Sequence, residues 1–165
     1  MEGTTVVEVP VGERTALERI LDESFEGWYL RHAKGTLRDV EMVRAAMLAG
    51  EPVALVMLKK LKEGVGYVYY IAVSRGHRRK GIGRLLLDNA LRYFEDSGVK
   101  EVFAGVEEDN APSEKLFESE GFKHTNLGEV SRKHGTLHAL NMYRMMVVVP
   151  GEILLHRELS STITP

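Results

Sequence analysis

A short basic, glycine-rich stretch is the part of this sequence whose residue types point most directly to chemistry. The segment "VSRGHRRKGIGR" (73–84) holds five Lys and Arg side chains and three glycines, and a helix-like pattern follows it. Glycines in a strand-to-helix turn let main-chain N–H groups approach a ligand closely, since no β-carbon intervenes. The first turn of the helix adds unsatisfied donors and a partial positive charge. The stretch therefore suits a phosphate or pyrophosphate group, although a plain structural turn with a solvated basic rim has the same composition.

Two common phosphate-binding loops do not fit this spacing. A mononucleotide P-loop requires G-x-x-x-x-G-K-[ST], and the sequence contains no such string. A dinucleotide fingerprint requires a third glycine three residues after Gly83, where Leu86 stands instead. What remains is the pattern R-x-x-G-x-G, from Arg78 to Gly83, directly after the strand-like "IAVS".

The rest of the chain predicts the elements that position this loop. The pattern of apolar residues and of turn residues predicts strands over 4–11, 51–61, 65–73, 99–106 and 137–149, and helices over 13–29, 36–50, 83–98 and 110–121. For the second helix, Thr36 and Asp39 serve as capping residues and Gly50 as the stop. The segment 128–139 is expected to be a basic loop. Strands interleave with helices, so the expected fold class is α/β with a mixed sheet.

Length and composition indicate one soluble domain. The chain has 165 residues, a formal net charge of −2 and no cysteine, which excludes a disulfide framework, a thiolate metal site and a cysteine nucleophile. No global charge points to nucleic acid, and no apolar run is long enough for a membrane span. The N-terminus also lacks the pattern of a secretion signal. We therefore expect a cytoplasmic protein with neither nucleic acid nor membrane as a partner.

A second motif lies one strand further along the chain. Residues 110–122 read "NAPSEKLFESEGF", and together with the loop this segment resembles the signatures of the GNAT family of N-acetyltransferases. Asn110, Leu116, Gly121 and Phe122 match the family pattern, while Phe117 stands where a tyrosine is usual. The resemblance covers about residues 5–149 of a single domain, 1–165, with 150–165 as a C-terminal extension. It implies a mostly antiparallel central sheet flanked by helices, with a splayed strand pair that holds acyl-CoA.

The resemblance also implies how acetyl-CoA is bound. The backbone of residues 71–73 would pair with the pantetheine arm as an added strand. Backbone N–H groups from Arg79 to Arg84 would hold the pyrophosphate, and Arg78 would support the loop or reach the phosphate on the adenosine side. Asn110 would contact the lower pantetheine or the thioester. The full set of expected acetyl-CoA residues is Ile71, Ala72, Val73, Arg78, Arg79, Lys80, Gly81, Ile82, Gly83, Arg84, Asn110, Ser113 and Phe117.

The implied reaction is direct acetyl transfer from acetyl-CoA to a primary amine of a small molecule or a protein. The amine must lose a proton, and the departing thiolate must gain one. Phe117 has no exchangeable proton, and Tyr67 and Gly105 stand at the two positions where relatives commonly carry a carboxylate base. We therefore expect Glu107 as a water-linked base and Tyr69 as a hydroxyl donor, with Tyr143 as a further proton donor.

Several alternatives stay open on the sequence alone. The loss of the usual tyrosine and carboxylates also fits a non-catalytic acyl-CoA-binding sensor or scaffold, and the loop alone also fits a protein that binds ATP. The histidines show no metal-site spacing, so no structural or catalytic metal is expected. The apolar tail, which includes Ile153, Leu154, Leu155 and Leu159, is expected to pack on the domain or across a homodimer interface.

Overall fold

A computed structural model describes residues 3–62, 64–146 and 148–160 of the chain. Its strands form one seven-stranded sheet in the order β1-β2-β3-β4-β5-β7-β6. Most described strand pairs are antiparallel, and β4 pairs with β5 in parallel. The expected mixed α/β class is confirmed. The chain divides into two compact units, which consist of residues 1–59 with 70–93 and of residues 60–69 with 94–165.

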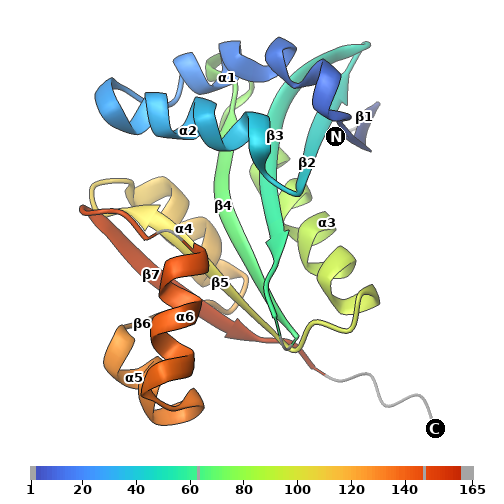
Figure 1. Ribbon diagram of the computed structural model, residues 1–165. Coiled ribbons are helices and arrows are strands. Elements are labelled where there is room, and N and C mark those ends of the chain that lie inside the picture. The colour runs from blue at the N-terminus through green and yellow to red at the C-terminus, as the bar shows by residue number, and fades with distance from the viewer. Residues whose placement is uncertain (1–2, 63, 147, 161–165) are drawn as a thin grey trace, which may run out of the picture. The chain divides into compact units, whose positions relative to one another are not determined.

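The first unit contains the N-terminal strands and most of the helix that follows the basic loop. Strands β1 (Thr4–Glu8), β2 (Met42–Leu48) and β3 (Glu51–Lys60) form an antiparallel meander. The 3-10 helix η1 (Val11–Leu17) and helices α1 (Glu18–Asp22) and α2 (Gly27–Asp39) contact one another, and α1 and α2 are the blue helices of Figure 1. Their buried side chains include Leu17, Ile20, Leu21 and Phe25, which are the stripe that gives this segment its helical period.

The second unit contains the C-terminal strands and three helices. Strand β5 (Glu101–Glu107) pairs in parallel with β4 (Val65–Val73), of which residues 65–69 belong to this unit. Strand β7 (Glu152–Glu158) pairs with both β5 and β6 (Lys123–Thr125). The helices of this unit are α4 (Ala111–Ser119), α5 (Leu127–His134) and α6 (Thr136–Met146). In Figure 1, α5 and α6 lie in front of β7 and α4 lies behind it. Helix α3 (Ile82–Asp96) spans the boundary between the units and buries Leu86, Leu87, Ala90, Leu91 and Phe94.

The helix predicted over 36–50 is wrong beyond Asp39, and Thr36 and Asp39 lie in the last turn of an earlier helix instead of capping the start of a new one. Helix α2 ends at Asp39, and residues 42–48 form strand β2 between β1 and β3. The alanines and methionines of this segment favour a helix locally, but pairing on both edges of the strand overrides that preference. Ala49 and Gly50 both have positive φ, at 50° and 82°, so they form the tight turn of a β-hairpin.

Three expectations about the C-terminal third also need correction. The basic segment 128–139 is not a loop, since it carries α5 and the start of α6. The strand predicted over 137–149 is the helix α6 up to Met146. The last strand is instead β7, which the sequence pattern placed in an extension; Leu154, Leu155 and Leu159 are all buried. The apolar tail is therefore a sheet strand, and its apolar residues no longer argue for a homodimer.

Candidate functional site

The basic loop between β4 and α3 has the backbone that its glycines suggested. Strand β4 ends at Val73, a short 3-10 turn η2 covers Arg75–His77, and α3 begins at Ile82. Arg79 and Gly81 both adopt positive φ, at 60° and 78°. When residues with right-handed and left-handed backbone conformations alternate just before a helix, their successive main-chain N–H groups point to one side. That side can bind an anion. The side chains of Arg75, Arg78, Arg79 and Lys80 are exposed around this turn.

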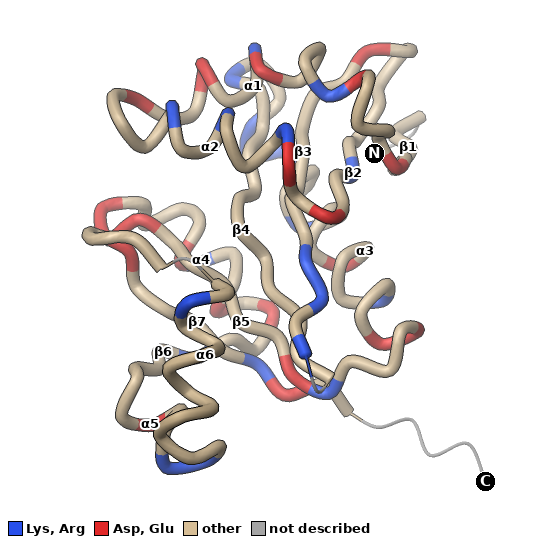
Figure 2. The backbone as a smooth tube through the Cα atoms, viewed as in Figure 1, with Lys and Arg blue, Asp and Glu red and all other residues tan. Residues whose placement is uncertain are grey.

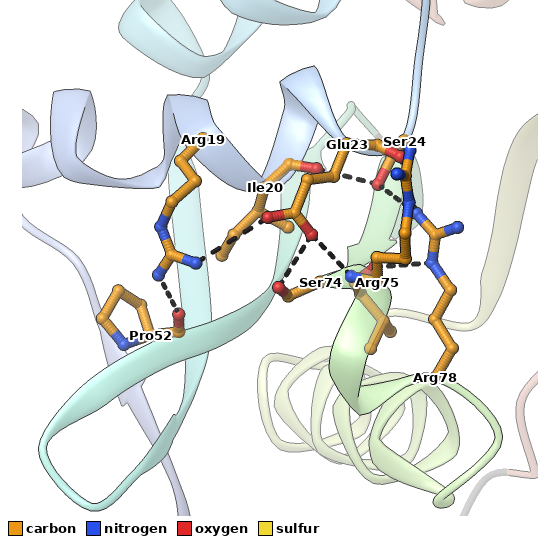
Figure 3. A network of polar contacts seen from close by, with 9 residues as sticks. Arg19, Ile20, Glu23, Ser24, Pro52, Ser74, Arg75 and Arg78 are labelled. Atoms are coloured by element: carbon orange, nitrogen blue, oxygen red, sulfur yellow. Dashed lines mark hydrogen bonds and ion pairs between the residues drawn. The ribbon is translucent and has the colours of Figure 1, made fainter.

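A carboxylate from the end of α1 fixes the start of this loop (Figure 3). Glu23 Oε2 accepts hydrogen bonds from the hydroxyl of Ser74, at 2.8 Å, and from the main-chain N–H of Arg75, at 2.5 Å. Arg78 closes the network, because its guanidinium donates to the main-chain carbonyls of Val73, at 2.9 Å, and of Glu23, at 2.8 Å. The loop is therefore fastened to the end of α1 by the carboxylate and main-chain carbonyl of Glu23, which lies outside the R-x-x-G-x-G pattern, and by Arg78, the first residue of the pattern.

The electrostatics of Glu23 agree with this anchoring role. The hydrogen bond from the Arg75 N–H and that from the Ser74 hydroxyl lower the pKa of Glu23 below its usual value. Sequence reasoning missed Glu23, since nothing in "LDESF" distinguishes it and the partners lie some fifty positions away. Of the two roles considered for Arg78, the described contacts are those of a loop support.

The second motif caps and packs helix α4. Asn110 is the N-cap residue, and its Oδ1 accepts the main-chain N–H of Ser113 at 3.2 Å. Phe117 is buried and packs edge-on against Phe122, with the ring centroids 5.1 Å apart. Its ring therefore has a core-packing role in the structure. Contacts of Asn110, Ser113 and Phe117 with acetyl-CoA stay predictions, as do those of the backbone from Ile71 to Val73.

The three expected proton-transfer residues occupy different settings. Tyr69 donates its hydroxyl to the main-chain carbonyl of Met145, at 3.0 Å, and is buried against Tyr67. Tyr143 lies on α6 rather than on the expected strand, and burial raises its pKa. Glu107, at the end of β5, has a raised pKa because of burial and because of the charges of Glu152 and Asp109. Their catalytic roles stay predictions.

The structure adds Glu152, a carboxylate that sequence reasoning missed. It is the first residue of β7 and the register partner of Glu107 on β5. A β-carbon placed on Gly105 would lie 2.6 Å from the hydroxyl oxygen of Tyr67 and 3.0 Å from Oε2 of Glu152. Figure 2 shows acidic residues, in red, gathered at this end of β5 and β7. The signal that could have found Glu152 is the strand-like pattern of "EILLHRE" (152–158), which predicts a further strand at this end of the chain.

A second ionic cluster lies further along the same face of β5. Glu101 is buried, and its carboxylate lies 2.8 Å from Nε2 of His134, 3.0 Å from Nζ of Lys133 and 3.7 Å from Nε2 of His156. Burial raises the pKa of Glu101, but His156, Lys133 and His134 outweigh it, so the pKa falls to about 2. A cavity of about 170 Å³ adjoins the cluster between α5 and the strands.

The fold also brings together a histidine and two glutamates that are separated in the sequence. His124 Nε2 lies 2.6 Å from Glu114 and 3.5 Å from Glu118, and the three ligand atoms fall within 4.8 Å of one another. The group is near the surface, where the imidazole of His124 is hydrogen-bonded to Glu114. The expected absence of a metal stays a prediction. Among the described residues, none of the helices has the length and apolarity that crossing a membrane requires.

Comparison with known proteins gives a consistent family. Residues 13–122 match the model of the acetyltransferase (GNAT) family. Mycothiol acetyltransferases of Beutenbergia cavernae and Geodermatophilus obscurus are 36% and 37% identical over 73 and 60 residues, which are 44% and 36% of this chain. The matched stretches span only a quarter and a fifth of the length of those relatives.

Solved structures match nearly the whole fold at low identity. The Escherichia coli ribosomal-protein-S18-alanine N-acetyltransferase superposes with a TM-score of 0.71 at 19% identity, over 95% of this chain and 94% of that one. The PaiA N-acetyltransferase of Thermoplasma acidophilum, solved with coenzyme A, gives 0.70 at 13% identity, over 94% and 99%. A GNAT acetyltransferase of Elizabethkingia anophelis with acetyl-CoA bound gives 0.68 at 16% identity, over 96% and 100%. These likenesses establish the fold.

Proposed function

Because the chain belongs to the acetyltransferase (GNAT) family, we propose that it moves the acetyl group of acetyl-CoA to a primary amine by direct transfer. The observation that carries the proposal is the loop between β4 and α3. Its backbone turns through positive φ at Arg79 and Gly81 directly before the helix, and Glu23 and Arg78 hold its first half in place. A turn of this kind suits the pyrophosphate of a coenzyme A ester.

The binding proposal assigns the loop backbone and not its side chains to the pyrophosphate. The N–H groups of residues 79–84 would face the phosphates, while the exposed Arg and Lys side chains add a positive field around them. The main chain from Ile71 to Val73 would pair with the pantetheine arm. Acetyl-CoA supplies the acetyl group as an activated thioester.

Proton transfer is assigned to residues of the second unit. An amine with a pKa near 10 is mostly protonated at neutral pH, so a base must take a proton from it. Glu107 is half-buried, and burial together with the charges of Glu152 and Asp109 raises its pKa, which makes it a stronger proton acceptor than an ordinary glutamate. Tyr143 suits protonation of the thiolate better than Tyr69, whose hydroxyl already donates to the Met145 carbonyl.

The acceptor is proposed only as a primary amine of a small molecule or of a protein. One sequence relative is named a mycothiol acetyltransferase and one structural neighbour a ribosomal-protein-S18-alanine N-acetyltransferase, and fold likeness does not select between such substrates. A cytoplasmic location and a homodimer stay predictions. Sedimentation of the full chain at tens of micromolar, on the order of a typical assay, tests the dimer.

The test is release of the CoA thiol from acetyl-CoA in the presence of amine panels: peptides with free N-termini, lysine peptides, polyamines, amino acids and aminoglycosides. Acceleration by one class, with an acetyl mass gained by the product, supports the proposal and names the class. The variant Gly81→Ala should lose acetyl-CoA binding, because φ of 78° strains any side chain there. Gly35→Ala is the matched control, since a β-carbon at Gly35 meets no atom within 4 Å and its φ is not positive. Binding of acetyl-CoA without turnover would favour the sensor or scaffold alternative.

A further inference from the structure

We propose that Glu152, and not Glu107 alone, accepts the proton from the acceptor amine. This inference rests on the proposed function, because it assigns one step of that reaction. It starts from a juxtaposition that the fold creates within the second unit. The carboxylate of Glu152 and the hydroxyl of Tyr67 both reach the space beside Gly105, from strands on either side of β5.

Gly105 is the residue that makes this arrangement fit. It is the first residue of β5 beyond the described parallel ladder with β4, which ends at Val68 and Ala104. A β-carbon at this position would lie 2.6 Å from the Tyr67 oxygen and 3.0 Å from Oε2 of Glu152. The distance to the Tyr67 oxygen is shorter than real β-carbon contacts show and that to Glu152 is unusually tight, so a side chain at this position would have to shift the phenol and crowd the carboxylate. The glycine therefore gives its side-chain space to a carboxylate and a phenol.

The position of the Glu152 carboxylate is fixed by a second contact. Its Oε2 accepts the main-chain N–H of Val149 at 3.1 Å, across the turn that leads into β7. A main-chain donor of this kind favours the charged form of a carboxylate and limits its rotation. Glu152 is thus held as an oriented anion at the end of the strand, which is what a proton acceptor requires.

The neighbouring Glu107 has the complementary property. It lies opposite Glu152 in the β5–β7 register, and the Glu152 charge raises its pKa together with burial and Asp109. Two interacting carboxylates do not lose their protons independently, and the one with the better donor ionises first. The Val149 N–H orients the Glu152 carboxylate beside Glu107, so the two carboxylates form one interacting pair at this end of β5 and β7.

The proposed transfer conserves atoms and charge. The acceptor ammonium gives one proton to Glu152, which becomes a neutral carboxylic acid and later releases that proton to water. The nitrogen lone pair then forms the N–C bond with the thioester carbonyl carbon. The C–S bond breaks with its electron pair on sulfur, and the thiolate takes the second nitrogen proton. The products are the amide, the CoA thiol and one proton in solution.

The experiment compares Glu152→Gln with Glu107→Gln and with Glu158→Gln in the full chain. Glu158 is the matched control, because it lies on the same face at the other end of β7 and is largely exposed. Glutamine keeps an oxygen for the Val149 N–H, so the fold should be retained, and the melting temperature checks this. We measure kcat with an accelerating amine, acetyl-CoA affinity, and the pH dependence of kcat between about pH 5 and pH 10, a range that reaches the deprotonation of the amine. The ionisable groups around this site are Glu107, Asp109 and Tyr67.

We expect kcat of Glu152→Gln to fall by about 100-fold or more, with acetyl-CoA affinity unchanged within about twofold. We also expect kcat of the variant to rise with pH across the range, because hydroxide or the free amine must replace the base. With an amine that is already neutral at the assay pH, kcat of Glu152→Gln should fall much less. The control Glu158→Gln should behave as the parent chain.

The outcomes separate this inference from the proposed function. If Glu152→Gln retains the parent kcat and pH profile while turnover proceeds, Glu152 is not the base and the proposed function still stands. If no amine accelerates thiol release from the parent chain, the proposed function fails and this assignment fails with it. A loss of kcat confined to Glu107→Gln would also overturn the assignment, because it would place the base on β5.

Discussion

The guanidinium of Arg78 donates to the main-chain carbonyl of Glu23 at 2.8 Å, while the carboxylate of Glu23 accepts the main-chain N–H of Arg75. The pair thereby locks both the start and the middle of the basic loop onto the end of α1. Because these contacts hold the loop in one conformation, its backbone is already arranged before a ligand binds. Less conformational entropy is then lost on binding. Glu23 is therefore a positioning residue for the proposed pyrophosphate site.

The first prediction concerns Glu23. The variant Glu23→Gln keeps the shape of the side chain but removes its negative charge. The hydrogen bonds from Ser74 and Arg75 become weaker, because their acceptor is no longer charged. We expect acetyl-CoA to bind about fivefold more weakly, which corresponds to about 1 kcal/mol. Isothermal titration measures this. Glu26→Gln, on the next turn of chain and exposed, is the control; an equal loss in both variants would show that general surface charge and not loop anchoring is responsible.

The second prediction separates backbone from side-chain binding at Arg79. Its φ of 60° is a conformation that asparagine tolerates better than most residues. If the main chain of the loop holds the pyrophosphate, Arg79→Asn should keep the acetyl-CoA dissociation constant within about threefold at physiological salt, since only a screened charge is removed. A loss of more than about tenfold would assign a direct phosphate contact to the guanidinium.

The third prediction concerns the close contact at Gly105. The variant Gly105→Ala should destabilise the fold by about 1–3 kcal/mol, because its β-carbon collides with Tyr67 and Glu152. In the background of Tyr67→Phe the oxygen at 2.6 Å is gone, so the same change should cost less. Chemical denaturation of the four proteins of this cycle measures the coupling. Additive effects would mean that the two residues do not compete for this space.

The fourth prediction follows from the buried Glu101. Its pKa of about 2 lies below that of an unfolded glutamate, so its charge stabilises the folded state fully above about pH 4.3. This contribution is lost as the pH falls from about 4.3 to about 2. We expect Glu101→Gln to lower the free energy of unfolding at pH 7 by about 2 kcal/mol and to flatten its dependence on acid pH.

Denaturation series at about pH 7, 5 and 3 give the comparison for Glu101, because the first two lie above the window in which its stabilising charge is lost and the third lies within it. The control is Glu158→Gln, which removes the exposed second partner of Lys133 and should change little. An acid transition that is the same in Glu101→Gln and in the parent chain would contradict the assignment.

The fifth prediction tests the proximity of Glu107 and Glu152 without any substrate. The charge of Glu152 contributes to the raised pKa of Glu107, so Glu152→Gln should lower the pKa of Glu107 toward its usual value. Carbon-detected NMR titration of the glutamate carboxyl groups measures this shift. A Glu107 titration that does not respond would mean that the two carboxylates are not neighbours in solution.

The sequence by itself determined the features that depend on local pattern. The glycines and basic residues of 78–84, after a strand-like segment and before a helical stripe, specified a strand–turn–helix whose backbone suits the proposed pyrophosphate site. Asn110 and Phe122 fixed the ends of the second motif, and Asn110 does cap α4. These signals are local because turns, caps and amphipathic stripes depend on residues within a few positions of one another.

Only the tertiary structure decided which distant residues meet. Strand β2 was hidden because alanine and methionine favour a helix until neighbouring strands pair with them. Helix α6 was hidden because a short apolar run has no clear period. Glu23 and Glu152 gained their importance from contacts across some fifty residues and across a strand register. Such contacts depend on packing and pairing between elements, which no local pattern encodes, and for that reason the loop was predictable while the carboxylates around it were not.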